Sequence, residues 1–520
     1  MLKSFEGRNL GELAEIVSGM TTGNNNLYLR EWNEVDINSI AFGYSNVDDI
    51  DLSLTKWIPY HKGGEQRKWY GNNEYVVNWS QSGNFNRAKT TMTYLYLKPC
   101  VTWSDISGNT FAGRFCNGGF MFDVKGSCGF GNEDDLKYLM AIFNSKIMPT
   151  YIEALNPTTT TQVGDLKRIP LKPIDATIKE MLFPLVEDNI RISKEEWDNY
   201  EQSWDFMTHP LIKYKKSSGL IIEAMNELKN SISLLMQTMR DNEEKINSII
   251  IAEYGLQNEI SPDVSIENVS LRQIDERREI CSLLSYAVGC MFGRYSVDKQ
   301  GIAYAGGEWK TDNYSNFIPD EDNVVLITDE EYFADDIVGK FCSWLEVVFG
   351  KEALEANIKY IAETLENKAE TSRAVIRNFF INEFEEFHIK GYEKRPIYWL
   401  FDSGKQNGFK ALVYMHRYNA DTIGNLRVDY LHRMERIYES EINRMQDTID
   451  NSSNAREVTA ATKRKEKLQK QLKECQEYDE KIGHLALSRI DIDLDDGVKV
   501  NYEKVQTAND GKKYQVLAKI

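Results

Sequence analysis

The chain changes its sequence texture near residue 172, and this change most constrains what it can fold into. Before that point the 520-residue sequence is rich in Gly, Asn, Trp, Tyr and Thr and has only short apolar runs. After it, apolar residues recur every three or four positions over long stretches rich in Glu and Lys. The first pattern is typical of short strands and the second of helices. We therefore predict an α+β chain, with a small β-rich domain followed by a large mainly α-helical domain.

The first part contains three predicted strands and one predicted helix. The strands are at residues 74–79, 92–97 and 119–124, where β-branched and aromatic residues lie between Gly, Asn or Pro. The helix is at residues 134–146, because Asp residues stand at its start and a Lys near its end. Trp57 and Trp79 are expected to fill the core of this part.

The second part is predicted to be helical over most of its length. A long helix runs from Met225 to beyond Ile249 and stops near Gly255. Residues 272–294 and 335–390 are also predicted to be helical, with a Gly-rich connection at 301–307. Two amphipathic runs, 431–449 and 458–482, flank a polar turn at 451–454. They predict an antiparallel helical hairpin roughly 40 Å long with a solvated outer face.

Composition and cysteine usage exclude several classes of protein. The net charge is −18 and the pI about 5.0, which argues against a freely nucleic-acid-binding chain. Seven cysteines and six histidines form no Cys-x-x-Cys or His-Glu-x-x-His spacing, so no metal site is predicted and the thiols are expected to be reduced. There is no signal-peptide core and no long apolar run, so a cytoplasmic location without membrane contact is expected.

A search for a methyl-transfer or phosphate-binding centre finds none in the sequence. An amino-methyltransferase needs a glycine-rich turn after a strand for S-adenosylmethionine and an Asn/Asp-Pro-Pro-aromatic motif for the flipped base. The nearest stretches are residues 156–159, which lack the second Pro and the aromatic, and 401–405, whose setting is wrong. No Gly-x-x-x-x-Gly-Lys-Ser/Thr loop occurs either. We therefore expect no catalytic, cofactor-binding or metal-binding residues in this chain.

The stretch from residue 56 to residue 172 differs from the rest in charge. It carries fourteen basic and nine acidic residues, a balance of +5 that leaves −23 on the remainder. Trp and Tyr residues are interleaved with the basic ones, a combination suited to phosphates, base edges and stacking. Within it, Gly63-Gly64 followed by Arg67-Lys68 makes an awkward core but a good backbone approach to a ligand, which favours a functional loop at residues 62–70.

Residues 57–73 (WIPYHKGGEQRKWYGNN) resemble the signature of the PglX family, the adenine-specific DNA methyltransferases of BREX phage-defence systems. Together, the matching segments span nearly the whole chain and are specific. The further segments that resemble the family are residues 19–25, 102–107, 122–127, 156–158, 162–165, 204–206, 209–211, 286–296, 398–404 and 495–502.

The resemblance implies a function and a domain order. In the family an S-adenosylmethionine-binding catalytic domain precedes this region, so we expect that domain to be missing, with Met1 at the junction. The predicted domains are a target recognition domain (1–174), a helical C-terminal domain (175–420), the antiparallel hairpin (421–486) and a C-terminal tail (487–520). The expected partners are double-stranded DNA, a catalytic methyltransferase domain or subunit, and other BREX proteins.

Two functions stay open at this point. The first is sequence-specific DNA recognition for an adenine-specific methyltransferase; the second is a protein-interaction subunit that docks BREX or methyltransferase partners with little DNA affinity. Basic side chains suit phosphates and guanine, and Asn or Gln suits adenine. The predicted DNA-binding residues are Lys62, Arg67, Lys68, Trp69, Tyr70, Asn72, Asn73, Arg87, Ser104, Arg114, Asn117, Lys125, Ser127 and Gln162.

Overall fold

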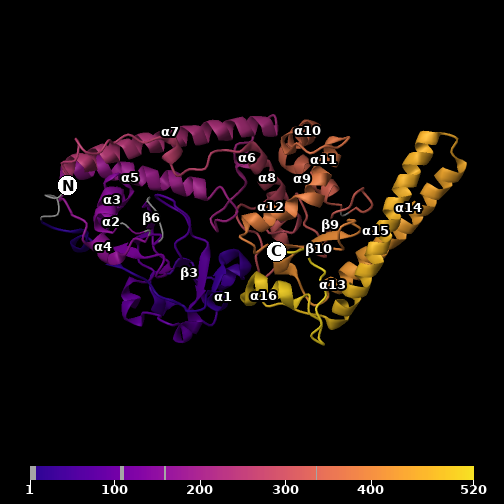
Figure 1. The fold of residues 1–520 in the computed structure, drawn as a ribbon, viewed down its shortest axis with the longest axis horizontal. Coiled ribbons are helices and arrows are strands. Elements are labelled where there is room, and N and C mark those ends of the chain that lie inside the picture. Colours follow the sequence, from indigo (N-terminus) through magenta and orange to yellow (C-terminus); the bar gives the residue numbers. More distant parts are fainter. Residues whose placement is uncertain (1–6, 106–110, 157, 159, 335) are drawn as a thin grey trace. The chain divides into compact units, whose positions relative to one another are not determined.

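The computed structural model describes residues 7–105, 111–156, 158, 160–334 and 336–520 (Figure 1). These residues form two compact units. Unit 1 comprises residues 7–32, 37–206 and 228–274, and unit 2 comprises residues 33–36, 207–227 and 275–520. Unit 1 therefore takes in helical residues after position 174 that the sequence analysis grouped with the second domain.

Unit 1 is built on two four-stranded sheets. The first has the order β1-β8-β5-β6 and is antiparallel throughout; the second has the order β2-β4-β3-β7 and is antiparallel except for the parallel pair β3-β7. The strands are β1 (Glu15–Val17), β2 (Leu29–Glu31), β3 (Trp57–His61), β4 (Tyr75–Asn78), β5 (Cys100–Trp103), β6 (Gly113–Cys116), β7 (Met121–Phe122) and β8 (Cys128–Phe130).

The two sheets of unit 1 share a hydrophobic core. Ile58, Val77 and Phe122 enter it from one sheet, and Cys100 and Phe130 from the other. Trp57 and Trp79 are 1% and 6% exposed, which confirms that they are core residues. Burial of large apolar side chains at this density is the main stabilising term for a unit with so many short strands.

Helices cover the sheets of unit 1. They are α1 (Asn25–Tyr28), α2 (Glu133–Asn144), α3 (Ile147–Leu155), α4 (Val163–Lys167), α5 (Ala176–Trp197) and α7 (Ile221–Glu253), of which α7 belongs to unit 1 from Leu228 onward. Helix α2 begins where expected, because the Asn132 side chain accepts a hydrogen bond from the Asp135 backbone and three acidic residues occupy the first turn. The predicted strands at 74–79 and 119–124 are confirmed as β4 and β7.

The predicted strand at residues 92–97 is wrong. Residues Thr90–Leu95 form 3₁₀ turns instead. Lys89 before them and Leu97 after them both have positive φ angles, at 51° and 64°, which a continuous strand does not tolerate. Tyr96 is buried, and its hydroxyl donates a hydrogen bond to the carbonyl of Ala88. Core packing, rather than strand propensity, therefore determines the backbone conformation here.

Unit 2 is mainly helical around one small sheet. The antiparallel sheet has the order β10-β11-β9. Its strands are β9 (Val325–Leu326), β10 (Tyr398–Asp402) and β11 (Lys410–Tyr414), and its helices are α6 (Pro210–Lys213), α8 (Glu276–Met291), α9 (Ile337–Phe349), α10 (Leu354–Leu365), α11 (Ser372–Asn382), α12 (Phe384–Gly391), α13 (Thr422–Asn425), α14 (His432–Asn451), α15 (Ala455–Ser488) and α16 (Gly497–Lys504).

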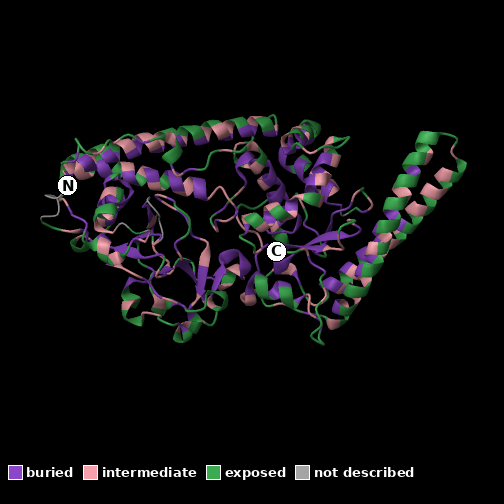
Figure 2. Ribbon diagram, in the orientation of Figure 1, coloured by how far each residue is buried: buried purple, intermediate pink, exposed green. Residues whose placement is uncertain are grey.

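The long helices predicted from apolar periodicity are confirmed. Helix α7 ends at Glu253, just before Gly255 with its φ of +68°. Helices α14 and α15 form the antiparallel hairpin, and the Asn454 side chain caps α15. At about 1.5 Å per residue the two helices are roughly 30 and 50 Å long. Figure 2 shows the hairpin becoming more exposed toward its turn, where only the two helices cover each other.

The α+β class predicted from the sequence is confirmed. Within the residues that the structure describes, no helix is both long enough and apolar enough to cross a membrane.

A buried carboxylate links two helices of unit 2 and allows a stability prediction. Asp336 is 0% exposed and accepts hydrogen bonds from the backbone of Val338 and Gly339 at 3.0 and 3.1 Å, at the start of α9. It also accepts from Arg377 of α11 at 2.9 Å. Since Asp336→Ala would leave a nearly buried guanidinium unpaired, we expect a loss of about 3–5 kcal/mol in unfolding free energy.

Chemical unfolding followed by circular dichroism measures this loss. The matched control is Lys359→Ala, because Lys359 is 71% exposed on α10 and its ion pair with Glu363 is at the surface. That variant should unfold like the parent chain. An Asp336→Ala variant as stable as the control would contradict the role assigned to Asp336.

Candidate nucleic-acid interface

The segment Lys62 to Asn73 lies at the centre of the predicted DNA-binding residues, and ion pairs from two helices hold it. Arg67 forms an ion pair with Glu196 of α5 and donates to the Ser193 carbonyl at 3.2 Å. Its guanidinium also lies 5.0 Å from the ring centroid of Trp197. The Arg67 side chain is 8% exposed, so its charge is satisfied inside unit 1 and does not face solvent.

Helix α7 holds the next two residues through a single carboxylate. The Lys68 ammonium and the Trp69 indole N–H both donate to Glu243, at 2.9 and 2.8 Å. Trp69 is fully buried, with a φ of 70°, and its backbone pairs with Gly113 and Phe115 at the edge of β6. A tryptophan in this conformation persists only when surrounding contacts impose it, and here sheet and helix contacts do so together.

Three further buried polar residues, Asn72, Ser104 and Arg114, hold a glycine turn. Gly63 and Gly64 have φ angles of +99° and +104°, which favour glycine. The Asn72 amide donates to the Gly63 carbonyl at 3.1 Å, and the Ser104 hydroxyl donates to the Gly64 carbonyl at 2.9 Å. Arg114 donates to the same Gly63 carbonyl at 3.3 Å. These side chains therefore hold the backbone of the turn.

Arg114 is the most buried of the predicted DNA-binding residues that carry a charge. It is 2% exposed, and neither Nε nor Nη1 has a hydrogen-bond partner among the described residues. Burial lowers the pKa of Arg114 to about 10. Because this guanidinium is buried, its charge acts on the interior of unit 1. It is not placed to contact a phosphate of DNA.

Asp123 connects the turn to the second sheet. Its carboxylate, 2% exposed, accepts hydrogen bonds from the Tyr60 hydroxyl and the Lys62 ammonium, both at 2.7 Å, and from the Lys125 backbone at 2.8 Å. Burial and the neighbouring Asp123 carboxylate raise the pKa of Tyr60 well above its usual value. Lys62 is therefore directed along the interior side of the turn, with 24% of its side chain exposed.

The structure divides the fourteen predicted residues into two groups of seven. The buried ones are Arg67, Trp69, Asn72, Asn73, Ser104, Arg114 and Ser127. The exposed or half-buried ones are Lys62, Lys68, Tyr70, Arg87, Asn117, Lys125 and Gln162. Arg87, Asn117, Lys125 and Gln162 of the second group are exposed, whereas Lys62 and Lys68 pair with the buried carboxylates of Asp123 and Glu243.

Four loops bring part of the exposed group together. The Asp105 backbone N–H donates to the Lys125 carbonyl at 3.0 Å, and the Thr161 N–H donates to the Asp105 carbonyl at 2.9 Å. Gly63 lies so close to Lys125 that a Cβ atom on it would stand 2.8 Å from that carbonyl oxygen. We call residues 62–66, 104–105, 124–127 and 160–162 the Gly63 loop cluster; it contains Lys62, Lys125 and Gln162.

Two of the exposed residues lie on other loops. Arg87 pairs through its backbone with Thr21, and Asn117 lies in the turn between β6 and β7. The sequence alone does not indicate that Arg87 and Asn117 lie apart from the cluster, because each loop pairs with residues from distant parts of the chain.

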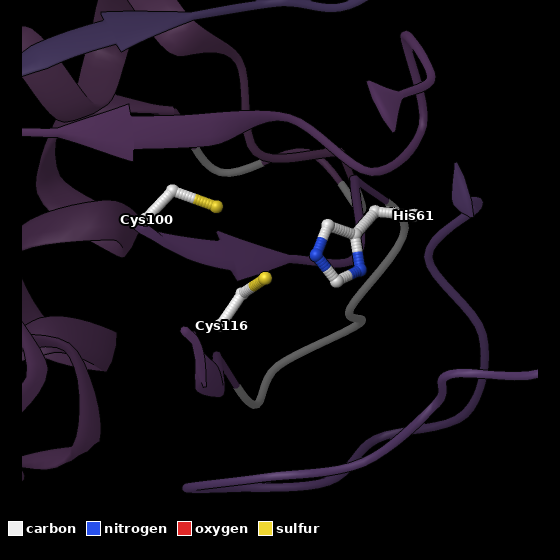
Figure 3. Close-up of side chains that lie close together, drawn as sticks. All are labelled: His61, Cys100 and Cys116. Carbon is white, nitrogen blue, oxygen red and sulfur yellow. The ribbon is translucent and has the colours of Figure 1, made fainter. Parts of the chain in front are cut away.

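One grouping was missed by the sequence analysis, which predicted no metal site. His61, Cys100 and Cys116 gather in the interior of unit 1, with their ligand atoms within 4.8 Å of one another (Figure 3). They are far apart in sequence and follow no known ligand spacing. In the sequence, the only indication of this group is that each of the three residues begins or ends a short apolar run.

Comparison with known proteins identifies relatives over nearly the whole chain. No family model matches the sequence. It is 37% identical over 523 residues, covering 97% of the chain, to the adenine-specific methyltransferase PglX of Lacticaseibacillus casei (strain Zhang). It is also 34% identical over 519 residues, 93% of the chain, to the adenine-specific methyltransferase BrxX of Escherichia coli O9:H4 (strain HS).

These identities confirm the resemblance to PglX: the chain is a homologue of adenine-specific methyltransferases. It spans 43% and 42% of the length of the two relatives, so less than half of each is represented in it.

The contacts of Arg67 predict that its replacement affects folding. Arg67→Ala would leave the Glu196 carboxylate, 1% exposed, without its ion partner, which typically costs about 3–5 kcal/mol. Arg87→Ala, at an exposed position of the same unit, should leave stability unchanged. Chemical unfolding of both variants measures the difference, and an Arg67→Ala variant that unfolds like Arg87→Ala would show that the ion pair is dispensable.

Proposed function

We propose that this chain is the DNA-recognition portion of an adenine-specific DNA methyltransferase of a BREX-type phage-defence system. The observation that carries the proposal is homology to adenine-specific methyltransferases over 97% of the chain, in a sequence that has neither a glycine-rich S-adenosylmethionine motif nor an Asn-Pro-Pro-aromatic motif. An enzyme that methylates one particular adenine must also recognise the DNA sequence around it. We propose that the residues of this chain serve that recognition step.

S-adenosylmethionine does not fit the residues present. In unit 1 the described sheets are antiparallel apart from the two-residue pairing of β3 and β7, and in unit 2 the described sheet is antiparallel. A methyl donor of this kind is expected on a glycine-rich turn after a strand, which the sequence lacks. Methyl transfer would therefore depend on a cofactor-binding domain or subunit outside these residues.

Within unit 1 we propose the Gly63 loop cluster as a DNA contact. Its exposed groups are the Lys125 ammonium, 50% exposed and 2.7 Å from Asp105, and the Gln162 amide. A surface ion pair of this kind contributes little to stability, so exchanging Asp105 for a phosphate costs little. Lysine suits the backbone of DNA, and an amide suits an adenine edge.

Arg87 and Asn117 extend the proposed contact to other loops of unit 1. Both are exposed, and an arginine or asparagine in such a position is able to meet a phosphate or a base edge. Lys68 and Tyr70 are half-buried and stand beside the buried Arg67 and Trp69. We propose that the buried residues support the interface and that the exposed ones touch the duplex.

Two substitutions separate phosphate contact from base reading. Lys125→Ala should weaken binding of the chain to all duplexes alike and reduce the salt slope by about 1. Gln162→Ala should cost about 1–3 kcal/mol on duplexes selected by the chain from a random library, with little change on unselected DNA. Fluorescence anisotropy with the two DNA pools measures both effects.

The matched control is Lys359→Ala, an exposed lysine of unit 2 in a similar surface ion pair. It should bind both DNA pools like the parent chain. If Lys125→Ala also binds both pools unchanged, Lys125 makes no phosphate contact. Equal losses for Gln162→Ala on both pools would rule out base reading by Gln162.

A protein-interaction role is the alternative, and one observation favours it. In the outer half of the hairpin, Ile442, Met445 and Ile449 are only half-buried, although they form the apolar stripe of α14. Partly uncovered apolar residues are often completed by a partner. Binding to random duplex DNA over a salt series discriminates the two functions: absence of binding even at low salt favours docking, and a steep salt dependence favours DNA contact.

A further inference from the structure

Three cysteines project from one face of the first sheet of unit 1. The register of β5 and β6 places Cys100 opposite Cys116, and the register of β5 and β8 places Thr102 opposite Cys128. Residues two apart on a strand share a face, and directly paired residues share it too. The Cys100, Cys116 and Cys128 thiols therefore lie on the same side of the sheet, and all three residues belong to the core shared by the two sheets.

Two of the three thiols lie close together. The Cys100 and Cys116 sulfur atoms are within 4.8 Å of each other. The Cys116 sulfur also accepts a hydrogen bond from the Gly118 backbone at 3.3 Å. An N–H donor directed at a sulfur is the usual second contact of a cysteine that ligates a metal.

A histidine from the facing sheet completes the group. His61 is the last residue of β3 and is 3% exposed, and its ring stacks on Phe120 at 4.1 Å with an interplanar angle of 5°. Its Nε2 atom has no hydrogen-bond partner among the described residues. Figure 3 shows the His61 ring turned toward the sulfur atoms of Cys100 and Cys116. A buried imidazole nitrogen without a partner is costly unless something binds it.

We propose that His61, Cys100 and Cys116 bind a zinc ion, with Cys128 as the fourth ligand. Thiolate sulfur and imidazole nitrogen in a closed, buried setting are the donors of structural zinc sites. The ligand atoms of His61, Cys100 and Cys116, which lie within 4.8 Å of one another, need to contract by about 1 Å to meet a common ion at about 2.3 Å from sulfur and 2.0–2.1 Å from nitrogen, and the Cys128 thiol, which lies outside this group, has to turn toward them.

Charge balance agrees with this ligand set. Zinc binding to three cysteines releases three thiol protons to solvent, and a neutral imidazole with three thiolates leaves one net negative charge on the site. Arg114 lies on the same face of the sheet as the cysteines and is 2% exposed. Its guanidinium, whose Nε and Nη1 atoms have no hydrogen-bond partner among the described residues, would offset the negative charge of the site within the low-dielectric core.

A zinc ion in this position would join the two sheets of unit 1. His61 directly precedes the 62–66 segment of the Gly63 loop cluster, and Cys128 directly follows the 124–127 segment. Gly126 packs so closely on the His61 carbonyl that a Cβ atom would stand 2.4 Å from it. The proposed ion would therefore fix the start of the 62–66 segment and the end of the 124–127 segment. The zinc site itself stands on the core geometry and does not depend on DNA binding.

Metal analysis of the whole chain tests the proposal. The chain, purified under reducing conditions without chelators, should hold about one zinc per molecule. After replacement with Co²⁺ it should show thiolate-to-cobalt charge-transfer absorption typical of tetrahedral sulfur ligation. Cys100→Ser and Cys116→Ser should lose most of the zinc, and His61→Ala should weaken its retention. The matched control, Cys281→Ser, replaces a buried cysteine of unit 2 and should retain one zinc.

The cobalt spectrum of the unmodified chain keeps the test valid if a variant fails to fold. A folded parent chain that holds no zinc after zinc supplementation, and that shows no thiolate absorption with cobalt, would overturn the proposal. A Cys128→Ser variant with unchanged zinc content and an unchanged cobalt spectrum would remove Cys128 from the ligand set. Because zinc content is measured without DNA, its outcome is separate from that of the DNA-binding variants.

Discussion

The packing of unit 1 depends on two buried carboxylates. Glu196 of α5 pairs with Arg67, and Glu243 of α7 accepts hydrogen bonds from Lys68 and Trp69. These contacts link a segment between the sheets to helices more than a hundred residues later in the chain. Burying charges of both signs is unfavourable unless each is paired with good geometry, so the positions of the helices and the segment are mutually dependent.

These buried contacts change the functional interpretation of residues 57–73, the segment whose resemblance to the PglX family was noted first. Arg67, Trp69 and Arg114 have the residue types of a DNA-binding loop, yet their side chains are inside unit 1. We infer that they shape the glycine turn at Gly63, and that DNA contact falls to exposed neighbours such as Lys125. A similar division, with buried residues fixing a loop and exposed ones touching the ligand, is common at binding sites carried by loops.

The sequence predicted the helices well and the site less well, for physical reasons. Helix α7 and the hairpin have long apolar periods and clear stops, and these signals are local. The strand expected at residues 92–97 failed because the burial of Tyr96, a tertiary effect, outweighs its propensity. The partners of Arg67 lie 126 and 129 residues away, and the sulfur–imidazole group depends on strand register. Pairings between residues so far apart cannot be predicted from the pattern of a single sequence.

A double-mutant cycle between Arg67 and Glu196 tests the central claim most directly. The two single variants, Arg67→Ala and Glu196→Gln, and the double variant are compared by chemical unfolding and by anisotropy on duplex DNA. The account predicts a coupling energy of about 1–3 kcal/mol in unfolding, because the two side chains are in direct contact, and no loss of DNA affinity beyond that caused by unfolding. Additive unfolding effects, combined with a loss of DNA affinity in a fully folded Arg67→Ala variant, would contradict it.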